Sequence, residues 1–181
     1  MEYADGGSLK NYLKVNFDNI TWDDKYKFAF QLTDAVSFLH EEGIVHRDLH
    51  SGNILIRQGM IKLADFGLSK RIDVATEQSK VLGVIPYIDP KRFGGREGSE
   101  SNLQQDSLNL KSDVYSVGVL LWEISSGHPP FYSEEYDIYL AMKISNGLRE
   151  SIVPGTPEDY VKVFTDNRPA MSKLSEQPTY S

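Results

Sequence analysis

Three polar side chains near the middle of the chain have the types and spacing that chemistry requires. Asp48 and Asn53 lie five positions apart in "IVHRDLHSGNILI", residues 44–56, and Asp65 follows twelve positions after Asn53. Mg²⁺ takes one or two oxygen ligands from protein and completes its octahedron with phosphates and water. We therefore expect Asn53 and Asp65 to be Mg²⁺ ligands, and Asp48 to accept a proton from a hydroxyl nucleophile, or to orient it, during phosphoryl transfer.

A β-hairpin is expected to bring Asn53 and Asp65 together. Two short β-rich runs, residues 54–57 and 60–64, are joined by Gln58-Gly59, where glycine supplies the positive φ that a two-residue hairpin demands. With residue 54 opposite residue 63, Asn53 lies opposite Ala64, the residue before Asp65. The two side chains should then emerge at the same end of the hairpin, within about two strand spacings of ~4.8 Å.

Composition argues against several functional classes. The 181 residues carry 19 Lys plus Arg and 26 Asp plus Glu, a formal net charge of −7, which argues against nucleic acid and anionic membrane as partners. The absence of cysteine excludes disulfides and thiolate-metal sites. Residues 114–124, the longest apolar stretch, are shorter than the ~20 residues of a membrane span. No secretory signal is evident at the start, so we expect a cytoplasmic location.

Helical patterns dominate the chain. Thr21 precedes a segment in which apolar residues recur at three- or four-residue steps, Asp24 can complete the cap, and Gly43 follows the end. The run "KSDVYSVGVLLWEISSG", residues 111–127, has Ser112 as the expected N-cap and apolar residues on nearly every face. A helix of this second kind belongs in the centre of the molecule. The expected fold class is therefore mainly α, of the α+β type.

Two shorter helices and a loop complete the expected organisation. One helix should follow Ser133 and end near Gly147, and another should open with Thr156 as cap and Pro157 in the first helical position. Residues 94–109 are rich in glycine, serine and charge, and we expect them to form a surface loop.

Taken together, these motifs resemble the signature set of protein kinases. Each motif alone is weak, because short motifs often occur by chance. In combination the chain resembles the hinge and C-terminal lobe of a kinase over residues 1–174, with residues 175–181 as a polar, disordered tail. That lobe is a helical bundle in which a short β-hairpin carries the catalytic and metal-binding loops. The resemblance rests on His46, Arg47, Asp48, Leu49 and Asn53, then Asp65, Phe66 and Gly67, in that order around the hairpin.

The resemblance implies a role for each catalytic residue and two cofactors, ATP and Mg²⁺. Asp48 would be the catalytic acid/base, Asn53 and Asp65 the metal ligands, and Arg47 a receiver for a phosphate on the activation segment, residues 65–91. On the nucleotide side, the backbone of Glu2 to Ala4 would face adenine, while Leu9 and Leu55 close on the ring from below.

Supporting residues are implied in the same way. Asp113 would accept hydrogen bonds from the backbone of the catalytic loop, and Phe66 with His46 would form part of an apolar spine beneath the site. Ser69, Thr76 and Ser79 are the hydroxyl residues of the activation segment.

The chain also departs from the kinase pattern. Met1 already stands at the entrance to the hinge, so the Gly-rich loop, the phosphate-pairing lysine and its glutamate partner of an N-terminal lobe are absent. We therefore expect negligible phosphate transfer by these 181 residues alone. We also expect an exposed apolar surface that a partner would cover.

Three smaller departures concern single positions. His50 and Val84 stand where serine/threonine kinases usually have lysine and threonine. Lys91 replaces a glutamate that would pair with Arg168, and two like charges cannot form that ion pair. The segment between Phe164 and Arg168 also looks shortened.

Three functions compete on this sequence. The first is a protein kinase of the tyrosine-kinase-like group, with serine/threonine favoured over tyrosine because no Ala-Ala-Arg insert follows Asp48. The second is a small-molecule phosphotransferase of the aminoglycoside or choline type, in which "DLHxGN" with His50 is expected. The third is a pseudokinase that acts as a binding module. For the kinase, the expected partners are ATP and a protein substrate.

Overall fold

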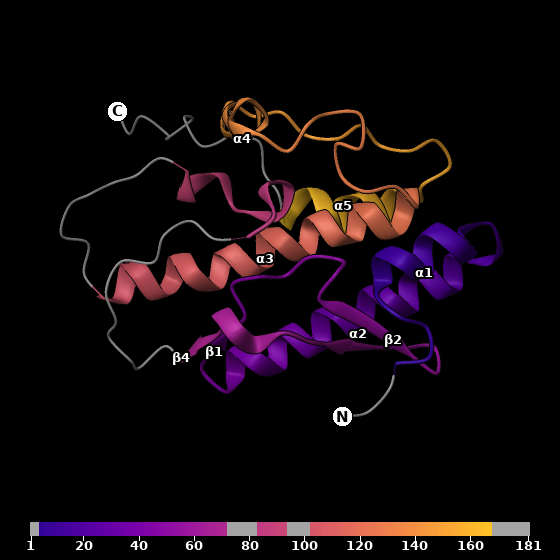
Figure 1. Ribbon diagram of the computed structural model, residues 1–181, viewed down its shortest axis with the longest axis horizontal. Coiled ribbons are helices and arrows are strands. Elements are labelled where there is room, and N and C mark those ends of the chain that lie inside the picture. Colours follow the sequence, from indigo (N-terminus) through magenta and orange to yellow (C-terminus); the bar gives the residue numbers. More distant parts are fainter. Residues whose placement is uncertain (1–3, 72–82, 94–101, 168–181) are drawn as a thin grey trace, which may run out of the picture.

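The structure, a computed structural model, describes residues 4–71, 83–93 and 102–167. Helices predominate, with two small antiparallel sheets, β1 with β4 and β2 with β3 (Figure 1). This mainly α architecture agrees with the expected fold class. The elements are α1 Leu9–Asn16, η1 Phe17–Asn19, α2 Trp22–Glu41, β1 Ile44–Val45, β2 Ile54–Arg57, β3 Met60–Leu63, η2 Phe66–Leu68, β4 Lys70–Arg71, η3 Ile85–Tyr87, η4 Pro90–Arg92, α3 Asn102–Ser126, α4 Ile138–Ser145 and α5 Glu158–Asn167, where η marks a 3-10 helix.

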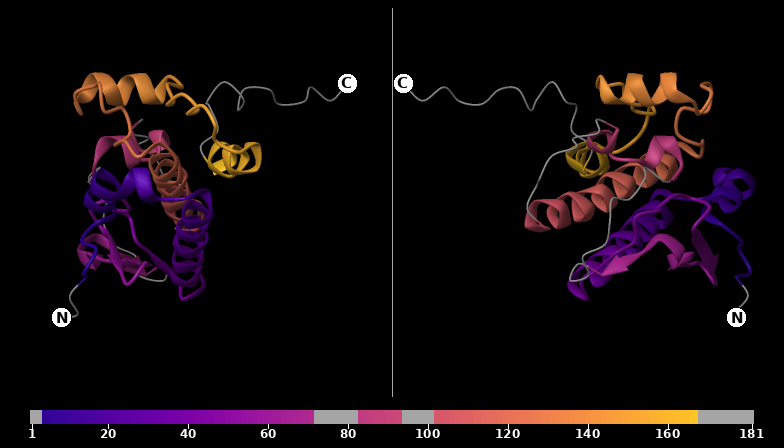
Figure 2. Two further views of the ribbon diagram at one scale, coloured as in Figure 1. Left: turned by 90° about the vertical axis from the view of Figure 1, so that its right-hand side faces the viewer. Right: turned by 60° about the vertical axis from the view of Figure 1, so that its left-hand side comes forward.

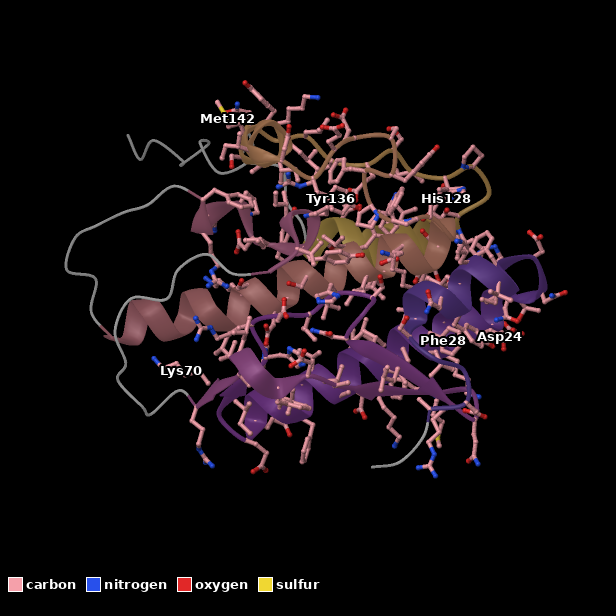
Figure 3. All side chains as sticks on the ribbon, in the orientation of Figure 1. Asp24, Phe28, Lys70, His128, Tyr136 and Met142 are labelled. Carbon is pink, nitrogen blue, oxygen red and sulfur yellow. The ribbon has the colours of Figure 1, made fainter. Side chains whose placement is uncertain are left out.

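Helix α2 begins and ends as the sequence predicts. The backbone N–H of Asp24 donates to the Thr21 hydroxyl at 3.2 Å, and the Asp24 carboxylate accepts the Thr21 N–H at 3.0 Å, which forms a capping box. Asp24 is labelled at this end of the helix in Figure 3. Gly43 follows the C-terminal end with a φ of 69°, a conformation that glycine adopts without strain.

Helix α3 lies between two halves of the molecule, with α1, α2 and the strands on one side and α4 and α5 on the other (Figure 2). Leu120, Leu121 and Ile124 of α3 are fully buried, as expected for a helix with apolar residues on all faces. They form one core with Leu32 of α2 and Tyr160 of α5, whose hydroxyl donates to the Leu121 carbonyl at 3.1 Å. The core therefore joins both halves to α3.

Two helix starts differ from the sequence prediction. Helix α3 begins at Asn102, so Ser112 is an interior residue, and the loop expected over residues 94–109 is wrong for residues 102–109. The leucine- and glutamine-rich residues before Ser112 are good helix formers, so the helix extends past Ser112 toward the N-terminus and does not begin there. Helix α5 begins at Glu158, and the Thr156 hydroxyl donates to the Val153 carbonyl instead of capping it. Helix α4 follows Ser133 and ends near Gly147 as expected, with Asp137 as its N-cap.

A buried lysine ties the start of α2 to the end of α3. The Lys25 ammonium donates to the Ser125 carbonyl at 3.2 Å and lies 4.0 Å from the ring centre of Phe17 and 4.6 Å from that of Trp22. Burial lowers the pKa of Lys25. Gly127 packs on the same Phe17 ring so closely that a Cβ would lie 2.5 Å from it. These contacts fix the two helix ends against each other.

Among the described residues, no helix is long and apolar enough to span a bilayer. The residues expected to form the C-terminal tail lie outside the described part of the chain.

Candidate active site

The hairpin has the predicted register. Ile54 pairs with Leu63 and Arg57 with Met60, and the Ala64 N–H donates to the Asn53 carbonyl at 2.9 Å. Strand β3 ends one residue before the expected end. In the turn, Gln58 joins Gly59 in having positive φ, at 50° and 70°. This is the backbone that a two-residue turn between twisted strands requires.

Asn53 is attached to Asp48. Its amide Nδ2 donates to the Asp48 backbone carbonyl at 3.0 Å and to Asp48 Oδ2 at 3.2 Å, and Asn53 itself is buried. Because the amide nitrogen faces the acid, the amide oxygen of Asn53 is the atom left for a cation. The five-residue spacing therefore lets the Asn53 amide hydrogen-bond to the Asp48 carboxylate at the start of β2.

Asp65 follows the other strand of the hairpin in a left-handed conformation, with a φ of 59°. Its Oδ1 accepts the Gly67 N–H at 3.2 Å, which leaves the second oxygen for another partner. Burial lowers the pKa of His50, and the charges of Asp48 and Asp65 both oppose that shift. Both carboxylates therefore favour the charged form of the His50 imidazole.

The imidazole of His50 lies beside Asp48. Its Nδ1 accepts the Gly52 N–H at 3.1 Å, and its Nε2 lies 3.7 Å from Asp48 Oδ2, beyond hydrogen-bond distance. The backbone of Gly83 passes on the other side of the acid, where a Cβ would lie 3.3 Å from Asp48 Oδ1. Asp48 thus lies between its own loop, residues 48–53, and the backbone at Gly83.

Asp113 fixes the backbone of the catalytic loop, as the resemblance implied. Its carboxylate accepts the backbone N–H of His46 at 2.8 Å and of Arg47 at 2.9 Å, and it also contacts His40 Nε2 at 3.0 Å. Asp113 is 1% exposed. The His46 ring lies 5.0 Å from that of Phe66 and its Nε2 is 3.1 Å from the Ala64 carbonyl, so the two expected spine residues are adjacent.

Arg47 lies in a small pocket with a second arginine. Burial lowers the pKa of Arg92, and the charge of Arg47 lowers it further. The pocket is lined by Arg47, Asp48, Leu49, Gly83, Val84, Tyr87, Ile88, Arg92, Ser112 and Ser116. Two guanidinium groups in one partly buried pocket favour binding of an anionic ligand.

The side expected to face the nucleotide is described only in part, because Glu2 lies outside the described residues. Ala4 is half-buried, and its carbonyl accepts the Gly7 N–H at 3.1 Å. Leu9 has no exposed surface, whereas Leu55 is half-buried. Of the two residues expected to contact the ring, only Leu55 therefore has an exposed surface, and Leu9 belongs to the core.

The sequence analysis did not predict one buried hydrogen-bond network. The Tyr87 hydroxyl donates to Glu123 Oε2 at 2.7 Å and lies 3.2 Å from the Ser51 hydroxyl. Glu123 is 2% exposed, and burial raises its pKa to about 7. The available signal was a lone acid inside the apolar run of α3. The network links the catalytic loop, the loop at residues 83–92 and α3.

Other expectations concern residues around the activation segment. The Ser69 hydroxyl donates to the His46 carbonyl at 3.4 Å. Thr76, Ser79 and Arg168 lie outside the described residues, so the relation between Lys91 and Arg168 stays a prediction.

Comparison with known proteins agrees with this geometry. A family model for the protein kinase domain matches residues 1–177. The chain is 34% identical over 184 residues to the probable serine/threonine-protein kinase roco5 of Dictyostelium discoideum, covering 92% of this chain and 6% of that protein. It is 30% identical over 165 residues to the probable serine/threonine-protein kinase PknB of Bifidobacterium longum, covering 87% and 22%. It is 29% identical over 197 residues to the serine/threonine-protein kinase nekl-2 of Caenorhabditis elegans, covering 98% of this chain and 52% of that protein.

The chain thus spans between 6% and 52% of the length of these three relatives. The family match covers nearly all of its residues, and the catalytic loop, the hairpin and the anchoring acid are arranged as described above. The chain belongs to the protein kinase family.

Proposed function

We propose that this chain is the C-terminal lobe of a serine/threonine protein kinase, which transfers the γ-phosphoryl group of ATP to a protein hydroxyl. The observation that carries the proposal is the hydrogen bond between Asn53 and Asp48, which joins an amide with a free oxygen to an acid. Asp65 follows the partner strand of the same hairpin. An acid for the hydroxyl and two oxygen ligands for a metal are what phosphoryl transfer asks of a protein.

In this proposal Asp48 orients the acceptor hydroxyl and takes its proton. Asn53, through its amide oxygen, and Asp65 would hold Mg²⁺, which when bound neutralises charge on the phosphate oxygens. Asp113 keeps the loop in place from behind. Arg47 would receive a phosphate from the activation segment, in the pocket that it shares with Arg92.

The base of ATP would lie between the hinge and β2. The Ala4 carbonyl already accepts a hydrogen bond from the Gly7 N–H. We therefore propose that the Ala4 N–H donates a hydrogen bond to adenine and that the backbone of Glu2 also contacts the base. Leu55 would lie against the ring, supported by Leu9. Leu55 is suited to this contact because it is apolar and keeps part of its surface exposed.

We further propose that a partner covers the apolar surface next to the hairpin and that the protein acts in the cytoplasm. Phe66 is 48% exposed and Met60 is 43% exposed, although both are large apolar side chains. These 181 residues alone should transfer negligible phosphate, because their sequence shows neither the Gly-rich loop nor the phosphate-pairing lysine motif of a kinase N-terminal lobe. ATP turnover by the isolated chain that Asp48→Asn abolishes would contradict this expectation.

Thermal unfolding tests the nucleotide site directly. A ligand that binds only the folded state raises the unfolding free energy by ~2.7 kcal/mol at a hundred times its Kd. For a chain of this size we expect Mg·ATP to raise Tm by about 2–4 °C per kcal/mol. Asp65→Asn should remove most of the magnesium-dependent rise, whereas Asp34→Asn, an exposed acid of α2, should leave it intact. A Tm that Mg·ATP leaves unchanged would contradict the proposal and favour the binding module.

The acceptor class needs a separate assay. In a version that carries an N-terminal lobe, a protein kinase should phosphorylate peptides and leave aminoglycosides and choline unmodified. The opposite preference would support the small-molecule phosphotransferase.

A further inference from the structure

Asp5 connects the hinge segment to the turn of the hairpin. Its Oδ1 atom accepts the backbone N–H of Gln58 at 2.9 Å and of Gly6 at 3.1 Å. The pairing of β2 with β3 ends at Arg57 and Met60, so the N–H of Gln58 belongs to the turn and not to the ladder. Asp5 supplies the acceptor that this turn N–H would otherwise find in water.

Residues 6–8 run alongside β2 and pair with it without forming a regular strand. The Gly6 N–H donates to the Ile56 carbonyl at 3.0 Å, and the Ile56 N–H donates to the Gly7 carbonyl at 2.8 Å. Ser8 forms an isolated bridge with Leu55. A Cβ on Gly6 would lie 2.9 Å from the Ile56 side chain, so only glycine permits this approach. Backbone pairing therefore holds the hinge to β2 from residue 6 onward.

Ala4 lies two residues before Gly6, the last residue that this pairing holds. The proposed contacts to the base come from two segments, Ala4 in the hinge and Leu55 on β2. The two hydrogen bonds of the Asp5 carboxylate extend the attachment by one residue, from Gly6 to the position next to Ala4. Their effect is to fix the hinge backbone relative to the strand that carries Leu55.

We propose that Asp5 is a positioning residue for the adenine base, because its carboxylate holds Ala4 at a set distance from Leu55. This inference rests on the proposed nucleotide site and identifies the side chain that orders its base half. The phosphate half, built from Asn53 and Asp65 at the far end of the hairpin from the turn, does not depend on Asp5. Loss of the carboxylate should therefore weaken base binding selectively.

Two probes separate the halves of the site in the 181-residue chain. Adenosine reports the base half and Mg·tripolyphosphate the phosphate half, each titrated by NMR. We expect Asp5→Ala to weaken adenosine binding about fivefold, as the loss of one hydrogen-bonded acceptor implies, and to change tripolyphosphate binding less than about twofold. Asp5→Asn keeps an acceptor oxygen and should retain wild-type affinity for adenosine. Asp18→Ala, an exposed acid of η1, is the matched control and should change neither affinity.

A purely structural Asp5 gives a different result. Unchanged adenosine binding in Asp5→Ala, or an equal loss for both probes, would overturn the inference. Amide hydrogen exchange gives a readout in the wild-type chain as well: the Gln58 N–H should be protected there and lose that protection in Asp5→Ala. A Gln58 N–H that exchanges freely in the wild type would show that the connection is missing. Failure of wild-type chain to bind either probe would overturn the nucleotide site, and the inference with it.

Discussion

The carboxylate of Asp113 holds the backbone of Arg47 in a left-handed conformation. Asp113 Oδ1 accepts the Arg47 N–H at 2.9 Å, and Arg47 has a φ of 71°, which a residue with a side chain adopts only at a cost of about 1–3 kcal/mol. The same carboxylate accepts the His46 N–H. Arg47, the residue before Asp48, is therefore kept in an unfavourable conformation by an acid sixty-six positions away.

Replacing this anchor should destabilise the fold. An amide at position 113 keeps only one acceptor oxygen, so Asp113→Asn leaves a buried backbone N–H unpaired, and we expect the unfolding free energy to fall by about 2–4 kcal/mol. Urea unfolding measures this change. Asp34→Asn, on the exposed face of α2, should change stability by less than about 0.5 kcal/mol. Equal stabilities for the two variants would show that the anchor contributes little.

Two glycines with similar backbones should respond differently to a methyl group. Gly43 and Gly127 each follow a helix and have φ values of 69° and 73°. A Cβ on Gly43 meets nothing within 4 Å, whereas a Cβ on Gly127 would lie 2.5 Å from the Phe17 ring. We expect Gly43→Ala to cost about 1–2 kcal/mol, the left-handed penalty alone, and Gly127→Ala to cost at least about 1–3 kcal/mol more. Thermal unfolding of both variants compares them; equal losses would mean that the Phe17 ring moves aside freely.

Glu123 should make the stability of the chain depend on pH. Its pKa is raised from 4.5 to about 7 in the folded protein, so between these values the folded state binds more protons than the unfolded state. The unfolding free energy should therefore fall as pH rises from 4.5 to 7, by on the order of 3 kcal/mol at ~1.4 kcal/mol per pKa unit.

Glu123→Gln isolates this effect because the amide oxygen can still accept the Tyr87 hydroxyl. Urea unfolding at pH 5 and pH 8 should show that the variant gains stability relative to the wild type at the higher pH. Glu135→Gln, an exposed acid, should follow the wild type at both values. A wild-type profile as flat as that of Glu123→Gln would mean that Glu123 ionises normally.

The hairpin turn offers a stabilising substitution. Gln58 occupies a position with a φ of 50°, where asparagine is favoured over residues with longer side chains. We expect Gln58→Asn to raise the unfolding free energy by roughly 0.5–1 kcal/mol, because the backbone N–H that binds Asp5 is unchanged. Calorimetry should record a higher Tm, with Gln31→Asn on α2 as a comparison that should not gain stability. A lower Tm for Gln58→Asn would contradict this account of the turn.

Local signals explain what the sequence predicts correctly. The register of the hairpin follows from a two-residue turn and two β-rich runs, and the start of α2 follows from Thr21 and Asp24 at capping-box spacing. Asp113 was recognisable because its place at the start of an apolar run matched the family pattern. Each of these features depends on residues that are neighbours in the chain or belong to a known motif.

Features that depend on distant contacts could not be predicted in this way. The network of Ser51, Tyr87 and Glu123 brings together three segments, and no spacing within one segment reveals it. Ser112 had the residue type of a helix cap, but a cap preference is weak when good helix formers precede it. The full burial of Leu9 is likewise a property of the packed core and not of its local sequence.

The contact between Lys25 and Ser125 closes a loop of one hundred residues. Contacts of such long sequence separation form late, since much chain entropy is lost before they stabilise anything. Until the end of α3 arrives, the Lys25 ammonium lacks the carbonyl that accepts its hydrogen bond, and the Phe17 ring lacks its contact with Gly127. A chain cut short before residue 125 would lack the carbonyl that receives this lysine, so the start of α2 would stay incompletely packed however well its cap is formed.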